Sequence, residues 1–167
     1  MKTRKLVSLV TVLALSPALA TPASAVVVTR ADGQPMNPNG EPFSASGIST
    51  LSKSTISANC TATFNGTITA TGIVTITSTQ FTGDGTCKLI SGTASSTSPW
   101  TGQADSATQL SINNANVNVE LLGPCGPSKV VTEWSNPNSS LTFNNAVLTP
   151  DCKVSGTIST SPKFHVQ

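Results

Sequence analysis

Polar and aliphatic side chains alternate along much of the chain after residue 50. At 67–69 and again at 75–77 an isoleucine stands between two threonines, and in "NVNVELL" Val117, Val119 and Leu121 alternate with polar residues. A period of two is typical of a β-strand with one buried face. We therefore expect strands in these segments, and also in short runs rich in β-branched residues at 129–134, 140–143, 146–149, 153–158 and 163–166.

Glycine, proline, asparagine and aspartate separate these runs. Asn65-Gly66 is typical of a type I′ hairpin turn, and Asp84 in "GDG" is typical of a turn residue. The stretch 99–110, "PWTGQADSATQL", is the nearest approach to a helix, but its Gly and Thr content favours a loop or a short turn. Many short strands at about ten-residue spacing predict an all-β protein, with a single antiparallel β-sandwich or barrel domain.

The first 25 residues have the pattern of a secretory signal peptide. A positive head is followed by an apolar run of about ten residues, too short to span a bilayer, and then by small residues. We expect cleavage after Ala25, with Ala20 as the second choice; an uncleaved anchor is the alternative. Residues 26–46, which include three prolines, are expected to form an extended N-terminal arm or a terminus without structure, and 47–167 the β domain.

The predicted signal peptide changes the charge of the chain. The full sequence carries nine Lys and Arg against seven Asp and Glu, but Lys2, Arg4 and Lys5 belong to the signal. Six bases and seven acids remain, for a net charge of about −1, so nothing favours nucleic acid or anionic lipid as a partner. Charged residues make up only 10% of the chain, and Ser, Thr, Asn and Gly are expected to form the surface in their place.

The chain repeats itself around its cysteines. "CKLISGTASSTSPW" begins at Cys87 and "CKVSGTISTSPKF" at Cys152, and in each case 26 residues separate this cysteine from an earlier one, Cys60 or Cys125. We interpret this as an internal duplication with units at about 60–100 and 125–164, although the Ser/Thr-rich composition could produce a similar phrase by coincidence.

Four cysteines in an exported chain imply disulfides, and three connectivities are possible. The repeat favours Cys60–Cys87 and Cys125–Cys152, one bridge within each unit. Each would stabilise the fold by about 3 kcal/mol if unstrained. A zinc site is disfavoured, because closely spaced ligand pairs are missing from the sequence.

Groups suited to catalysis are scattered. His165 is the only histidine and is expected to be an ordinary strand residue, while Glu120 and Glu133 are the only acids in strand-like runs. We therefore assign no catalytic, cofactor-binding or metal-binding residues. Trp100 and Trp134 are candidates for contact with an apolar surface if they are exposed, and core residues otherwise; Trp100, after Pro99, is the better candidate for exposure.

The sequence resembles a known family. The matching motifs are "CTATFNGT" at 60–67, "SPW" at 98–100, "GPCGPS" at 123–128 and "SGT" after the last cysteine, within a similarity that runs from about Phe43 onward. They are similar to the secreted bacterial protein activator of alkane oxidation, the Pra type. The resemblance implies a small secreted protein without enzymatic activity or cofactor, which assists growth on hydrocarbons and is associated with surfaces or biofilms.

Three functions follow for testing. The first is a secreted accessory protein that assists access to hydrophobic hydrocarbon at the cell surface or the oil–water interface, with an apolar interface or hydrocarbon as its partner. The alternative is a structural, adhesin-like subunit of a cell-surface fibre or biofilm matrix, in which the arm at 26–46 associates with another copy by strand addition. The third is a secreted hydrolase, disfavoured for want of a base. The expected location is outside the cell or at its surface, with the periplasm as the alternative.

Overall fold

The computed structural model describes residues 26–167. Within this range the chain forms strands and a single short 3₁₀ helix, so the all-β expectation is confirmed. The elements are β1 (Val28–Arg30), β2 (Glu41–Lys53), β3 (Ile56–Ile68), β4 (Ile73–Thr82), η1 (Cys87–Leu89), β5 (Ile90–Gly92), β6 (Trp100–Ser106), β7 (Gln109–Val119), β8 (Gly123–Ser135), β9 (Ser140–Leu148), β10 (Cys152–Ser161) and β11 (Phe164–Val166).

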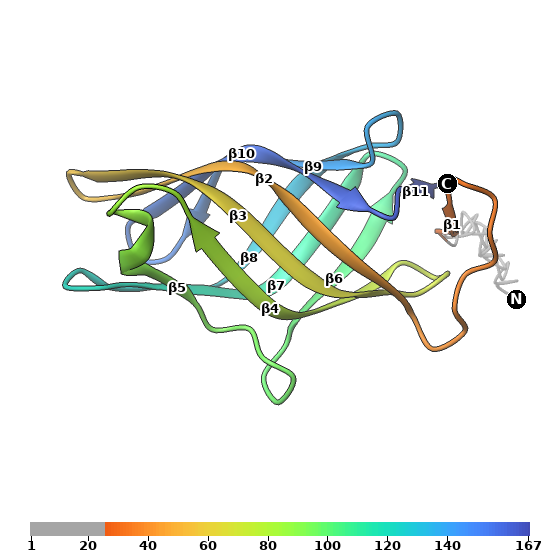
Figure 1. Cartoon of the computed structure of the whole chain (residues 1–167), viewed down its shortest axis with the longest axis horizontal. Helices are drawn as coiled ribbons and strands as arrows, with labels where there is room; N and C mark the ends of the chain where they lie inside the picture. Colours follow the sequence, from red (N-terminus) through yellow and green to blue (C-terminus); the bar gives the residue numbers. More distant parts are fainter. Residues whose placement is uncertain (1–25) are drawn as a thin grey trace, which may run out of the picture.

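Eight of these strands close into an antiparallel barrel (Figure 1). The order around the barrel is β7-β6-β4-β3-β2-β10-β9-β8, and the pairing of β8 with β7 closes the ring. One edge of β7 is shared between two partners, because β6 pairs with its first half and β5 with residues 117–119. Of the two expected architectures, the barrel is therefore the one that the chain adopts.

The alternation in the sequence places one face of each strand inside the barrel. Ile68 and Ile76, each between two threonines, are buried, and so are Val117 and Val119. Small and large residues alternate inside as well, with Ala62 next to Phe64 along the inner face of β3. An eight-stranded barrel is narrow enough for side chains to fill it, and this mixture of sizes suits that space.

The predicted hairpin turn at Asn65-Gly66 is wrong. Both residues lie inside β3, where the register with β4 shifts by one residue. A Cβ atom at Gly66 would lie only 2.0 Å from the carbonyl oxygen of Thr75, so the glycine permits a close approach of two backbones. The chain turns later, where the amide of Gly72 donates to the carbonyl of Thr69 at 3.0 Å.

The loop expected at 99–110 is also a strand. Residues 100–106 form β6, the turn lies at 107–108, and β7 begins at Gln109. Trp100, Gly102 and Ala104 alternate with exposed or half-buried residues and face inward. Gly102 and Ala104 occupy the inward positions after Trp100. Because both residues are small, the apolar period of two was hard to see in the sequence.

The N-terminal arm is part of the barrel assembly. Val28–Arg30 pair with β11, and residues 41–46 belong to β2, which pairs with β3 on one side and β10 on the other. The boundary expected at residue 46 is therefore corrected, because the backbone groups on both sides of it are satisfied by the same ladders. Strand addition to another copy would require these ladders to break. The predicted signal peptide, 1–25, lies outside the described residues.

One end of the barrel is closed by the β1–β11 ladder, drawn at the right of Figure 1. Val28, Phe164 and Val166 are almost completely buried there. The side chain of Asn136 fastens this plug to the barrel, since its Oδ1 accepts from the Val166 amide at 2.8 Å and its Nδ2 donates to the Val166 carbonyl at 2.8 Å. The same Oδ1 accepts from Trp134 Nε1 at 2.7 Å.

A charged cluster lies on the outside of this closed end. Arg30 donates to Asp32 and to Glu41, each at 2.6 Å, and Glu41 is itself buried. The hydrogen bond with Asp32 raises the pKa of Arg30 above its usual value, and the same bond lowers the pKa of the Asp32 carboxyl. The cluster ties β1 to the start of β2.

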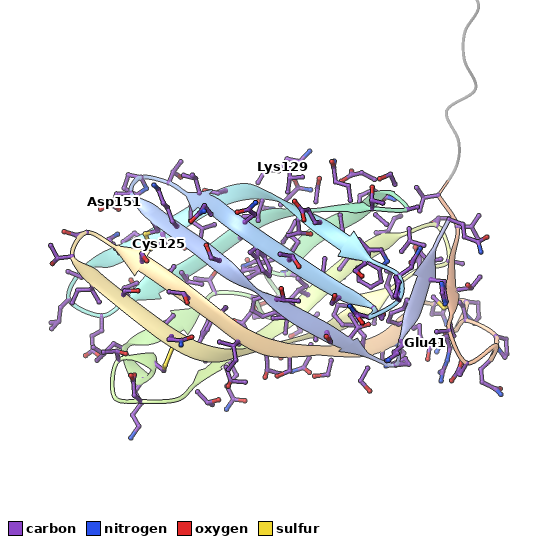
Figure 2. The ribbon with its side chains drawn as sticks, turned by 90° about the horizontal axis from the view of Figure 1, so that it is seen from above. Glu41, Cys125, Lys129 and Asp151 are labelled. Atoms are coloured by element: carbon purple, nitrogen blue, oxygen red, sulfur yellow. A yellow bond between two sulfur atoms is a disulfide. The ribbon has the colours of Figure 1, made fainter. Side chains whose placement is uncertain are left out.

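The opposite end carries both disulfides, and the predicted pairing is confirmed. Cys60 on β3 is bonded to Cys87 in η1, and Cys125 on β8 is bonded to Cys152 at the start of β10, each with a Cα–Cα distance of 5.7 Å. Figure 2 shows Cys125 and Asp151 at this end of the molecule and Glu41 at the other.

The proposed duplication stays a prediction, but the two units can now be compared. A shift of 65 positions brings β3 and β4 close to β8 and β9, so the first hairpins correspond. The units then diverge. After Cys87 the chain forms η1 and the short strand β5, whereas Cys152 begins the long strand β10.

Candidate functional site

The middle of the barrel is filled by an aromatic cluster. Phe64 on β3 meets the rings of Phe81, Trp100 and Phe143 edge-on, with centroid distances of 6.3, 5.9 and 6.4 Å. This arrangement is the one that aromatic quadrupoles favour. Because the four side chains come from β4, β6 and β9 as well as β3, the cluster joins strands from opposite sides of the barrel.

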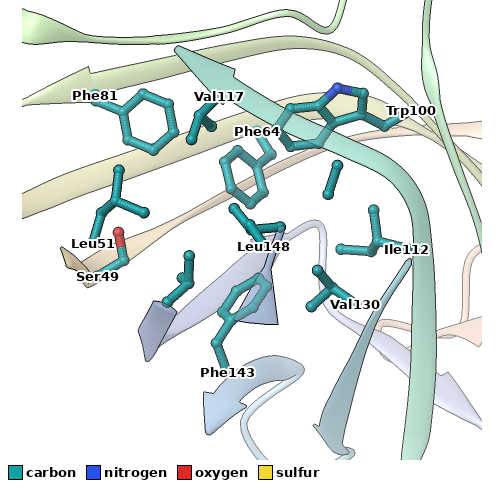
Figure 3. Close-up of a pocket in the computed structure, with 12 residues that line it drawn as sticks. Ser49, Leu51, Phe64, Phe81, Trp100, Ile112, Val117, Val130, Phe143 and Leu148 are labelled. Atoms are coloured by element: carbon teal, nitrogen blue, oxygen red, sulfur yellow. The ribbon is translucent and has the colours of Figure 1, made fainter. Parts of the chain in front are cut away.

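Small cavities remain on either side of this cluster. One of about 40 Å³ lies beside Phe64, Trp100 and Phe143 and is shown in Figure 3. Another of about 20 Å³ lies toward the closed end, beside Phe43 and Phe164. Both have almost entirely apolar walls and little room, so the middle of the barrel is close to the packing density of an ordinary protein core.

A larger cavity lies at the disulfide end, which we call the mouth. Its volume is about 140 Å³. This is close to the roughly 150 Å³ of an apolar cavity that stays dry and takes up benzene. The mouth is lined mainly by aliphatic side chains from the β2–β3 hairpin, the η1–β5 segment and the β7–β8 turn: Leu51, Lys53, Ile56, Ala58, Thr86, Leu89, Ile90, Val119, Glu120, Leu121 and Leu122.

The rim of the mouth contains an unusual leucine. Leu121 is 93% exposed and has a φ of 70°. It is the third residue of the turn 119–122, in which the Leu122 amide donates to the Val119 carbonyl at 3.0 Å. Gly or Asn normally takes a positive φ at this position, and another residue costs about 1–2 kcal/mol. The sequence pattern had placed Leu121 on the buried face with Val117 and Val119, and the structure corrects this because the strand ends at Val119.

Lys53 brings a positive charge into the wall of the mouth. Its ammonium group donates to the Pro124 carbonyl at 2.7 Å and the Gly123 carbonyl at 3.5 Å, and lies 3.4 Å from Asp151. Its side chain is only 8% exposed. The charge is therefore balanced by backbone oxygens at the start of β8 and by Asp151, and Lys53 is one of the residues that line the cavity.

The structure does not bring the candidate acids and the histidine together. Glu120 lies at the mouth, whereas Glu133 lies near the far end of β8, roughly 33 Å of strand beyond Gly123. His165 is exposed in β11 at the closed end and pairs with Thr29.

The loop before η1 shows what Asp84 does. The hydroxyl and the amide of Thr86 both donate to the Asp84 carboxyl group. These bonds lower the pKa of Asp84, and the bond from the hydroxyl has the larger effect. The expectation of a turn residue is confirmed.

Both tryptophans lie inside the barrel. Trp100 and Trp134 are 4% and 5% exposed, so neither offers the outer surface on which an apolar contact was expected. Their indole N–H groups donate to Thr93 Oγ1 at 3.3 Å and to Asn136 Oδ1 at 2.7 Å. Trp100 faces inward because β6 begins at this residue and its small neighbours Gly102 and Ala104 share the inward face.

Within residues 26–167, His, Cys, Asp and Glu side chains form no group of three or more that could hold a metal ion. The same part of the chain contains no helix that is long and apolar enough to cross a membrane.

The mouth was not anticipated from the sequence. Its lining comes from three segments that are distant along the chain, and the bridges at Cys60–Cys87 and Cys125–Cys152 hold them at one end. The available signal was the pair of leucines in "ELLGP", because two large apolar residues are unusual in a turn next to glycine and proline.

Fold and site together define a small disulfide-bridged β-barrel whose apolar interior opens into a cavity at one end. A family model, Alkane oxidation protein activator PraA/PraB-like, matches residues 1–167, so the chain belongs to this family. The resemblance seen in the sequence is thereby confirmed. No curated protein and no solved structure matches the chain.

Proposed function

We propose that the protein is a secreted accessory protein, itself not an enzyme, that assists access to or growth on hydrophobic hydrocarbon at the cell surface or the oil–water interface. The observation that carries the proposal is the combination of membership in an alkane oxidation activator family with an apolar mouth rimmed by exposed leucines.

A role without catalysis is supported by the distribution of polar groups. Oxidising an alkane requires the chemistry of a metal or flavin centre. In the described part of the chain, His, Cys, Asp and Glu side chains form no group of three or more that could hold a metal ion, and no titratable side chain lines the two apolar cavities inside the barrel. The protein would then act before the chemical step, with another protein performing the oxidation.

Secretion is supported by the two disulfides and by the pattern of residues 1–25. Disulfides form and persist in oxidising compartments such as the periplasm and the extracellular space. Both bonds close loops of the same length, with a sequence separation of 27 in each case.

The composition of the outer surface favours adsorption at the interface with an apolar phase. Hydroxyl groups pair across neighbouring strands on the outside of the barrel, as in Ser46 with Thr63 and Thr142 with Thr157, each at 3.0 Å. The free-energy cost of leaving water is smaller for a hydroxyl whose hydrogen bonds are made within the sheet than for a charged group. A surface with few charges therefore carries a low cost of adsorption to oil.

The proposal can be tested with the chain 26–167 purified in its oxidised form. We expect it to lower the interfacial tension between water and hexadecane, to slow the coalescence of hexadecane droplets, and to raise the rate of hexadecane oxidation when added to hydrocarbon-degrading cells that lack it. An unrelated disulfide-bonded β protein of equal size is the control. Equal behaviour of the two proteins in all three measurements would remove the proposal.

A further inference from the structure

We infer that the mouth is a binding site for one end of an unbranched alkyl chain, which enters with its methyl end inward and is covered by Leu121 and Leu122. The inference rests on the proposed function only in choosing an alkane among apolar ligands; the site itself is argued from the geometry.

The first step is the size and chemistry of the cavity. A volume of about 140 Å³ with a mainly aliphatic lining suits about six carbon atoms, since a cavity of roughly 150 Å³ takes up benzene. Leu51 lines both the mouth and the 40 Å³ cavity deeper in the barrel. A rotation of this one side chain would join the two spaces and admit a longer chain.

The second step is the exposed leucine. Leu121 is placed in water and in a backbone conformation that suits Gly or Asn, and both circumstances are unfavourable for leucine. Ile56, on the β2–β3 hairpin across the same cavity, is also 42% exposed. A ligand between these two side chains would remove apolar surface of both from water.

The third step concerns the orientation and class of the ligand. The only cation in the lining, Lys53, already faces two carbonyl oxygens and Asp151, so the wall has no ammonium group ready for a carboxylate or phosphate. Glu120 at the rim adds a negative charge, which disfavours an anionic head group. These features favour a hydrocarbon over a fatty acid or an anionic lipid.

The experiment is a titration of the ¹⁵N-labelled chain 26–167 with n-pentane, n-hexane, n-heptane and n-octane, followed by amide chemical shifts. We expect saturable shifts at Ala58, Ile90 and Val119, and little change at Phe164 and Val166 in the closed end. Affinity should rise about four-fold per added methylene group until the cavity is full. Hexanoate and dihexanoylphosphatidylcholine below its micelle concentration are the comparison ligands, and each should bind at least ten-fold more weakly than n-hexane.

Two matched variants test the site. Leu121→Asn replaces the exposed leucine by a residue that tolerates a positive φ, so the barrel should fold at least as well, while hexane affinity should fall about ten-fold. Ile73→Asn removes another half-exposed aliphatic side chain, at the start of β4 in the closed end, and should leave the affinity unchanged. Ala58→Leu, which fills the cavity from β3, should abolish binding.

Each outcome is decisive for the site. Saturable shifts confined to the mouth, with loss in Leu121→Asn and not in Ile73→Asn, would establish it. Absence of saturable shifts with any alkane, equal effects of the two asparagine variants, or tighter binding of hexanoate or the phospholipid would overturn it. If alkanes bind but the protein fails to stimulate hexadecane oxidation, the site stands and the proposed function fails; stimulation without binding has the opposite meaning.

Discussion

The two ends of this barrel are built from the same alternating strands but are finished in different ways. At one end the β1–β11 ladder and the buried Phe164 fill the opening, and Asn136 fastens them. At the other end two disulfides hold the strands while a cavity of about 140 Å³ remains between them. The difference shows how a small barrel can leave one end unfilled, because a covalent bond fixes strand positions without needing side chains in the space between.

The largest effect is expected at the closed end. Phe164→Ala should lower the free energy of unfolding by about 4 kcal/mol, because it removes a fully buried ring and leaves a cavity in the plug. Phe81→Ala, which removes a half-buried ring on the mouth side of the cluster, should cost about half as much. Urea denaturation of both variants measures this, and equal losses would mean that the plug is no more important for stability than the mouth side of the aromatic cluster.

The disulfides should have a slightly smaller effect, and an equal one. The paired change Cys125→Ala with Cys152→Ala, and the paired change Cys60→Ala with Cys87→Ala, should each cost about 3.5 kcal/mol, since both bonds close loops of the same length. Hydrogen exchange should then show faster opening at the mouth than at the plug. A uniform acceleration over the barrel would contradict the distinction between the two ends.

Asn136 offers a milder way to loosen the closed end. Asn136→Ala should cost about 2 kcal/mol, because Trp134 Nε1 and the backbone of Val166 lose their partner in a largely buried place. The matched change Asn65→Ala, at an exposed position in β3, should stay within about 0.5 kcal/mol. The two midpoints of urea unfolding are the measurement; similar values would mean that water replaces the lost contacts at Asn136.

The smallest expected effect is the loss of stability at low pH, to which a carboxyl group at each end of the barrel contributes. The pKa of Asp32 at the plug and that of Asp84 near the mouth are lowered in the folded state by their hydrogen bonds with Arg30 and Thr86. A lowered folded pKa gives stability that is complete above the unfolded value of about 3.8 and is lost as the pH falls through the folded pKa. Stability should therefore decline below about pH 4, and Asp32→Asn and Asp84→Asn should each flatten the decline. Thermal unfolding between pH 5 and pH 2 measures it, and slopes unchanged by both variants would remove these carboxyls from the explanation.

The comparison of the ends also shows what the sequence could reveal. Alternation placed Ile68, Ile76 and Val117 inside the barrel correctly, because burial of one strand face is a local property of the chain. The disulfide pairing was predictable because the two cysteine pairs have the same spacing and each second cysteine begins a similar phrase. The choice of barrel over sandwich was not, since it depends on β8 pairing with β7 to close the ring, and no local pattern specifies that contact.

The failures at Asn65-Gly66 and in the 99–110 segment have a common cause. In both, glycine suggested a turn, whereas Gly66 and Gly102 lie inside strands because neighbouring backbones or side chains come too close for a Cβ atom. Crowding of this kind is set by the other strands of the barrel. The mouth was hidden for a similar reason, because Leu51, Ile90 and Leu122 become neighbours only once the barrel has closed.

The pairing of β1 with β11 determines when the closed end of the barrel can fold during synthesis. Thr29 meets His165, so the contact joins residues separated by almost the whole described chain. Translation delivers these residues at different times, and the plug cannot form until residues 164–166 have been made. Until then Val28 has no ladder partner in β11 and the barrel interior stays open at that end. A chain interrupted before its last strand would therefore be left with an unsealed apolar core, which cellular proteases and chaperones can distinguish from the finished protein.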